Sequence, residues 1–167
     1  MDTPPPLETA ERLSWNDSLL LGYTPMDAVH QEFVQCVTAL QEASDADLPE
    51  RMAQLIAHAQ AHFGEEDRWM TQTEFPALEC HVNEHAAVMR SMLEVQELLA
   101  QGHTAICRDL ALELVRWFPG HADYLDAALA HWMCKQRLGG KPVVLRRKMA
   151  YTLSLHDALP INRKSVV

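Results

Sequence analysis

Aromatic residues and glycine are scarce in this chain of 167 residues. Aromatic residues make up 7% of it and only six positions are glycine, which disfavours a β-sandwich and favours a helical protein. No run of about 18 apolar residues occurs, so the sequence predicts no membrane-spanning helix. The opening segment Met1–Pro6 is neither basic nor apolar, and we therefore expect no secretory signal.

The four cysteines lack the close Cys-x-x-Cys spacing that is typical of metal or redox motifs. In a chain without a secretory signal, scattered cysteines are most often reduced thiols. We therefore expect a cytoplasmic protein with free thiols at Cys36, Cys80, Cys107 and Cys134.

Lysine is absent before Lys135, and residues 1–126 carry 22 acidic side chains against six arginines. From Ala127 to His156 the chain has no acidic residue, whereas six lysines and arginines occur there. Such a segment can bind phosphates or anionic lipid, but no aromatic or glycine pattern of nucleic-acid binding accompanies it. We expect it to be solvated or to offset the acidic body, with no nucleic-acid or membrane partner.

Apolar residues recur at helical spacing in four stretches that are separated by turn signals. We expect helices over about residues 25–43, 47–72, 77–100 and 105–137. Their short connections predict an all-α, up-down-up-down four-helix bundle over residues 14–138. Pro119-Gly120 falls inside the last stretch and predicts a kink there, because proline removes one backbone hydrogen bond.

Three segments are expected to lie outside this bundle. Residues 1–13 are rich in proline and predict a loose N-terminal arm, and residues 139–148 form a basic C-terminal extension. Residues 149–167 break the helical pattern, and their stretch from Tyr151 to Ile161 resembles translated sequencing-adapter DNA. We interpret that tail as non-native and assign it no function.

Histidines and carboxylates give the clearest functional signal. His62 with Glu66, and His81 with His85, lie four residues apart, which places each pair on one helix face. In a bundle core, such groups cost several kcal/mol unless they are paired. Five imidazoles and two carboxylates are too many for one tetrahedral ion, and they suit two ions of iron, zinc or manganese that share bridging carboxylates. The seven candidate ligands are His30, His62, Glu66, His81, His85, His121 and Asp126.

Other readings of the histidines exist. His58 lies on the same helical stripe as His62, and periodicity cannot say which of them is a ligand; we interpret it, with His103, His131 and His156, as an ordinary surface or core histidine. The segment His81–His85 also fits the inverted zinc-peptidase pattern H-x-x-E-H, which would leave the remaining candidates unexplained. Ferritin-like di-iron bundles use Glu-x-x-His, a motif that does not occur in this sequence.

The order His, His-Phe-x-x-Glu, His-x3-His and His-x4-Asp resembles the hemerythrin family, specifically bacterial hemerythrins. The resemblance extends from about Trp15 to Trp132 and includes the opening Trp15–Phe33. It implies two iron ions with a bridging oxo or hydroxo group. One iron would be held by His81, His85 and His121, the other by His30 and His62 with one open position, and Glu66 and Asp126 would bridge the two.

The resemblance also implies a function. It implies reversible O2 binding at the open iron position, for storage, delivery or sensing, with NO as a competing ligand and without enzymatic turnover. Trp117, Phe118 and Ala122 match the positions with which the family lines an apolar pocket at that site. Two alternatives stay open: a di-iron enzyme that acts on peroxide or NO, and an iron- or oxygen-responsive signalling module.

Overall fold

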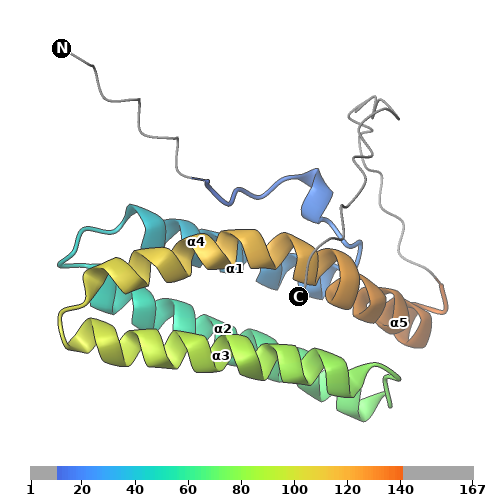
Figure 1. The fold of residues 1–167 in the computed structure, drawn as a ribbon. Coiled ribbons are helices and arrows are strands. Elements are labelled where there is room, and N and C mark those ends of the chain that lie inside the picture. Colours follow the sequence, from blue (N-terminus) through green and yellow to red (C-terminus); the bar gives the residue numbers. More distant parts are fainter. Residues whose placement is uncertain (1–10, 141–167) are drawn as a thin grey trace, which may run out of the picture.

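The computed structural model describes residues 11–140, which form an all-helical bundle (Figure 1). A short 3-10 turn, η1 (Asp17–Leu19), precedes the first long helix. The last expected helix is one helical run in three parts, in which a π-helical turn, η2, joins α4 to α5. The elements are α1 (Thr24–Glu42), α2 (Leu48–Gln72), α3 (Leu78–Ala100), α4 (Thr104–His121), η2 (Ala122–Asp126) and α5 (Ala127–Leu138).

Each long helix packs against the helices next to it in the chain, and α4 closes the ring against α1. Figure 1 shows α1 and α4 above α2 and α3, with their axes roughly aligned. This arrangement confirms the predicted up-down-up-down four-helix bundle. No helix within residues 11–140 is both long enough and apolar enough to cross a bilayer.

Local chemistry sets several helix ends. Pro25 and Pro49 lie in the first turns of α1 and α2, where the missing N–H costs nothing. Gly102 and Gly139 follow α3 and α5 with positive φ angles of 93° and 65°, a backbone region that glycine adopts without a steric penalty. These signals explain why the predicted and observed helices agree to within a residue or two at most ends.

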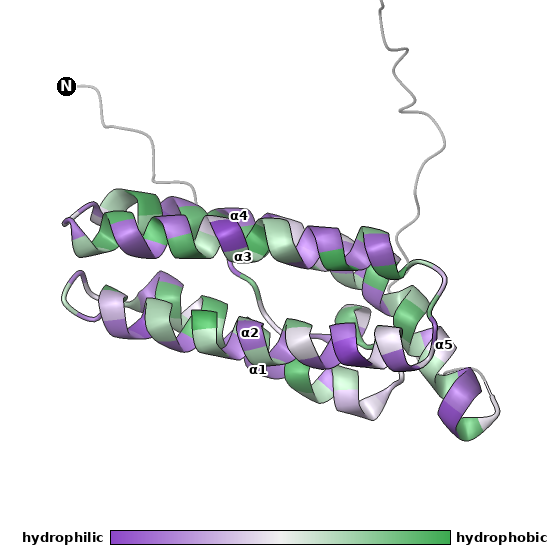
Figure 2. Cartoon of the chain, turned by 90° about the horizontal axis from the view of Figure 1, so that it is seen from below, coloured by the Kyte–Doolittle hydropathy of each residue, from purple (hydrophilic) through white to green (hydrophobic). Residues whose placement is uncertain are grey.

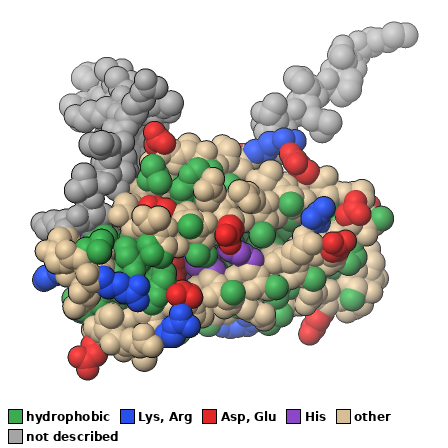
Figure 3. All heavy atoms as spheres, turned by 180° about the vertical axis from the view of Figure 1, so that it is seen from behind, with side chains coloured by type: hydrophobic (Ala, Val, Ile, Leu, Met, Phe, Trp, Pro, Cys, Tyr) green, Lys and Arg blue, Asp and Glu red, His purple; other side chains and the backbone are tan. Residues whose placement is uncertain are grey.

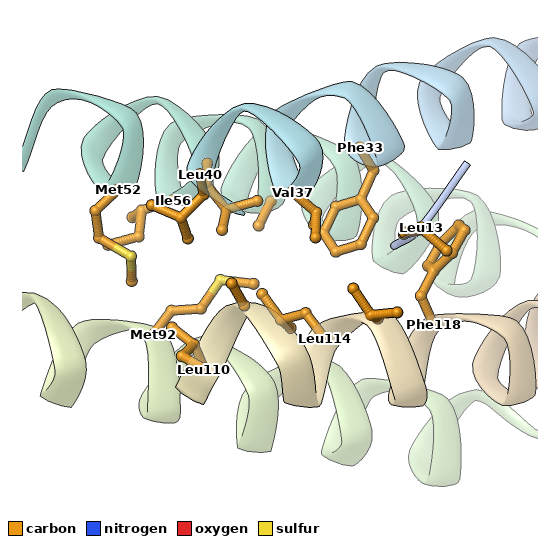
Figure 4. Packing of buried hydrophobic residues seen from close by; sticks show 14 of the residues in the cluster. Leu13, Phe33, Val37, Leu40, Met52, Ile56, Met92, Leu110, Leu114 and Phe118 are labelled. Carbon is orange, nitrogen blue, oxygen red and sulfur yellow. The ribbon is translucent and has the colours of Figure 1, made fainter. Parts of the chain in front are cut away.

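The apolar interior is divided into two clusters. The larger, in the body of the bundle, includes Phe33, Val37, Met92 and Leu114, which point toward one another between the helices (Figure 4). The smaller lies where α5 begins and has Met26, Trp69, Met70, Phe75, Leu129 and Met133 among its members. Hydrophobic and hydrophilic residues alternate along every helix, as helices with one buried face require (Figure 2).

The irregularity that Pro119 predicted lies just after it. Helix α4 continues through Pro119 and Gly120 to His121, and the backbone leaves α geometry only in η2. There the N–H of Ala127 donates to the carbonyl of Ala122, five residues earlier. Figure 1 shows α5 bending away from the line of α4 beyond this turn.

Ordered packing begins before the expected boundary at residue 14. Leu13 is buried in the larger apolar cluster, and Arg12 forms an ion pair of 3.0 Å with Glu42 of α1. The last residues of the expected loose arm therefore lie against the bundle, because an apolar side chain in the arm has a site to fill. The rest of that arm, most of the basic extension 139–148 and the whole tail 149–167 lie outside the described residues.

Candidate metal centre

The structure brings all seven candidate ligands together in the interior. They come from every long helix and from the π-helical turn, and each is at most 4% exposed. They form two groups, and within each group the atoms that could bind a metal ion lie within 4.8 Å of one another. The first group is Glu66, His81, His85, His121 and Asp126, and the second is His30, His62 and Glu66.

The π-helical turn explains the unusual spacing of the last pair. In an α-helix, side chains five residues apart point about 140° apart. A π turn forms i→i+5 hydrogen bonds, so residues five apart lie about one turn apart on the same side. His121 Nε2 accordingly lies 3.2 Å from Asp126 Oδ1.

The two carboxylates divide the histidines into two groups. Glu66 Oε1 lies 3.0 Å from His62 Nε2 and 3.5 Å from His30 Nε2, whereas Glu66 Oε2 faces His85 and His81 at 3.3 Å and 3.6 Å. Asp126 repeats this division. Its Oδ2 lies 3.2 Å from His30 Nε2, while its Oδ1 lies 3.0 Å from His81 Nε2. Each carboxylate therefore stands between a two-histidine group (His30, His62) and a three-histidine group (His81, His85, His121).

Many of these buried atoms have no hydrogen bond, although they lie close together. Within the described residues, both nitrogens of His30, both of His81 and both carboxylate oxygens of Asp126 lack a hydrogen-bond partner. Burying so many unpaired polar atoms in an apolar core is strongly unfavourable. Their inward orientation and nitrogen–oxygen chemistry fit divalent cations, which would satisfy them together.

The electrostatics of the site favour cation binding. Burial raises the pKa values of Glu66 and Asp126, but the surrounding histidines outweigh it and hold both pKa values well below the usual range. Burial lowers the pKa of His30, yet the closely placed carboxylates of Asp126 and Glu66 outweigh it and raise that pKa to about 9. Both carboxylates are therefore negatively charged at neutral pH, and the protonated imidazole of His30 balances part of that charge when no metal is bound.

Two carboxylates outside the cluster contact the outer nitrogens of two clustered histidines. His85 Nδ1 lies 2.9 Å from Asp67 Oδ1, and His121 Nδ1 lies 3.0 Å from Glu84 Oε1. The indole Nε1–H of Trp117 donates to the same Glu84 oxygen at 2.9 Å. Asp67 was not among the residues predicted from the sequence, and Glu84 was considered only within the pattern H-x-x-E-H. Their positions directly beside Glu66 and His85 were the available signal.

The zinc-peptidase pattern would require Glu84 to join the inward cluster, but Glu84 lies outside it. It is partly exposed and contacts His121 from outside, while His81 and His85 face Glu66. His58 also stays out of the cluster: its Nδ1 lies 3.7 Å from Glu32, and its ring centroid is 5.7 Å from that of His62. Figure 3 shows histidine side chains in the crease between the helices on the rear face.

Aromatic rings surround the histidines. The Phe118 ring stands against His30 with centroids 5.2 Å apart, and the Phe33 ring lies 4.8 Å from that of Phe118. Phe63 stacks on His85 at 4.2 Å with an interplanar angle of 9°. Of the three expected pocket residues, Phe118 and Ala122 are buried in the larger apolar cluster. The third, Trp117, packs beside the three-histidine group, with its ring centroid 4.4 Å from that of His121.

Comparison with known proteins agrees with this geometry. The family described as Hemerythrin HHE cation binding domain matches residues 21–132. A bacteriohemerythrin of Ralstonia nicotianae is 37% identical over 124 residues, covering 74% of this chain and 90% of the relative. A myohemerythrin of Riftia pachyptila is 25% identical over 112 residues, covering 67% of this chain and 86% of the relative. No solved structure gives a significant match.

The family match covers the segment that contains all seven clustered side chains. The names of both relatives denote hemerythrins rather than enzymes, in agreement with the expectation of a binding protein. The resemblance found in the sequence is thereby confirmed, and with it a cation-binding domain built as a four-helix bundle. The chain belongs to the hemerythrin family.

Proposed function

We propose that this protein binds two iron ions in its interior and uses them to bind O2 reversibly. The division of the two carboxylates carries the proposal. Each presents one oxygen to the two-histidine group and the other to the three-histidine group, as two ions with shared carboxylate ligands require. The relatives named bacteriohemerythrin and myohemerythrin support iron and O2 as the metal and the ligand.

In this proposal, His81, His85 and His121 hold one iron and His30 and His62 the other. Glu66 and Asp126 contribute an oxygen to each position and offset part of the cationic charge. The two-histidine position has one protein donor fewer, so it is the position left open to an external ligand. When bound, the iron pair supplies the electrons for reversible O2 binding.

The residues around the two-histidine position favour binding over turnover. Phe118 packs edge-on against His30, and Phe33 lies 6.0 Å from the ring of His62. Both phenylalanines are buried, at 1% and 0% exposure. Such apolar walls exclude water and slow proton delivery, and both conditions protect a bound gas from irreversible reduction.

Metal analysis and visible spectroscopy on the purified chain test the proposal. We expect two irons per chain and a visible absorption that appears when reduced protein meets air and disappears on deoxygenation, over repeated cycles. Steady consumption of peroxide or NO would instead support a di-iron enzyme. A protein partner retained only by the iron-loaded form would support a signalling module. Purified protein that takes up no iron after anaerobic loading would refute the proposal.

A further inference from the structure

The ligand histidines differ in what holds them from outside. In the three-histidine group, His85 and His121 each have Nδ1 within 3.0 Å of a carboxylate oxygen, from Asp67 and Glu84 respectively. The two carboxylates come from different helices, α2 and α3, and both are partly exposed at the bundle surface. Two of the three histidines in this group are therefore anchored by negatively charged acceptors.

The two-histidine group lacks such anchors. The Nδ1 atoms of His30 and His62 are buried and have no hydrogen-bond partner within residues 11–140. Aromatic rings, those of Phe118 and Phe33, pack against these histidines instead. An aromatic ring restricts the position of an imidazole but offers it no charge and accepts no conventional hydrogen bond from Nδ1.

Glu84 is itself held in place. Its Oε1 accepts hydrogen bonds from both His121 Nδ1 and Trp117 Nε1, and the Trp117 ring lies 4.4 Å from the His121 ring. The three side chains thus form one packed unit on the outer side of His121. Trp117 restricts the rotamers of Glu84, so the carboxylate is already positioned when a metal ion binds.

A carboxylate that accepts from the outer nitrogen of a histidine fixes the ring and its tautomer, leaves the inner nitrogen free to bind metal and makes it more basic. Loss of such a partner typically weakens metal binding about 10–100-fold. We propose that Asp67 and Glu84 are positioning residues that make the two metal positions unequal. The three-histidine position binds its ion more tightly and releases it last, and the two-histidine position is the labile one. This inference rests on the proposed two-ion site.

Metal release measures the difference directly. The iron-loaded chain is challenged anaerobically with an excess of a ferrous chelator, and the coloured complex is followed in time. We expect two phases of equal amplitude. Glu84→Ala and Asp67→Ala should accelerate the slow phase about 10–100-fold and leave the fast phase within a few-fold. Glu84→Gln, whose amide oxygen still accepts a hydrogen bond, should restore part of the slow rate, and Trp117→Phe should have a smaller effect than Glu84→Ala.

Two matched variants control for general effects of removing an acid. Glu65→Ala removes a neighbour of Glu66 that pairs with Arg68 on the surface, and Glu94→Ala removes an exposed acid from α3. Neither should change either phase, and thermal unfolding of these two control variants in their metal-free form should match that of the parent. A single release phase from protein that holds two irons, or equal acceleration of both phases by Glu84→Ala, would overturn the inference and leave the two-ion site standing. Protein that holds no iron would refute both.

Discussion

The ring of Phe118 stands almost perpendicular to that of His30, at 86°, with the two centroids 5.2 Å apart. Phe118 comes from α4 and His30 from α1, so the contact joins two helices at the two-histidine side of the centre. In the proposed function this ring keeps water from the open metal position.

Replacement of Phe118 by alanine should therefore shorten the period over which the protein binds O2 reversibly in air. The substitution should also cost about 3–5 kcal/mol of unfolding free energy, since it leaves a cavity in the core. Repeated oxygenation cycles followed by absorbance measure the effect. Phe75→Ala is the matched control, because it removes an equal ring from the smaller apolar cluster. If both variants lose reversible binding equally fast, Phe118 has no particular role at the site.

Loss of Glu66 should affect metal content more than loss of any single histidine. Its two oxygens face four histidines across both groups, at 3.0–3.6 Å. We expect Glu66→Ala to retain little iron and His121→Ala to retain less than two ions per chain. His58→Ala should keep both, because His58 lies outside the cluster although it shares the helical stripe of His62. Elemental analysis after gel filtration gives the answer, and full iron content in Glu66→Ala would contradict the proposed bridging role.

Metal uptake should release protons. The pKa of His30 is raised to about 9, so at about pH 7.5 this imidazole is protonated in the metal-free protein and must lose its proton to bind an ion. The apparent affinity for the metal should therefore rise with pH until His30 is fully deprotonated. Calorimetry of metal binding in buffers of different ionisation enthalpy should give at least one proton released per chain. A result of zero protons at this pH would contradict the charge state inferred here.

Three glycines provide a test of backbone effects with the site left intact. Gly64 and Gly120 lie within helices, and a methyl group added at either meets no atom within 4 Å. Alanine should therefore raise the unfolding free energy by about 0.5–1 kcal/mol at each. At Gly102, where φ is 93°, alanine should instead cost about 1–2 kcal/mol. Denaturant unfolding of the metal-free variants measures all three, and a loss of stability in Gly120→Ala would show that α4 needs glycine there.

The sequence alone predicts those parts of the site that depend on the periodicity of a single helix. Pairs four residues apart, such as His62 with Glu66, share one helix face by their spacing. The five-residue spacing of His121 and Asp126 does not indicate a shared face, since an α-helix separates such residues and the π turn that joins them has no simple sequence signal. Asp67 and Glu84 were also missed as anchors. Their role depends on which neighbouring helix lies opposite, and periodicity does not contain that information. Leu13 was assigned to a loose arm because proline and polar residues dominate the segment around it.

The position of the seven polar side chains between the two apolar clusters has a consequence for folding. On α1, for example, His30 lies between Met26 of the smaller cluster and Phe33 of the larger. Without bound ions, the two apolar clusters meet across a layer of buried polar atoms, many of which lack hydrogen bonds, so we expect the end that includes α5 to unfold separately. Bound ions would connect all four long helices through their ligand side chains. We therefore expect one unfolding transition for the metal-loaded protein and two for the metal-free protein.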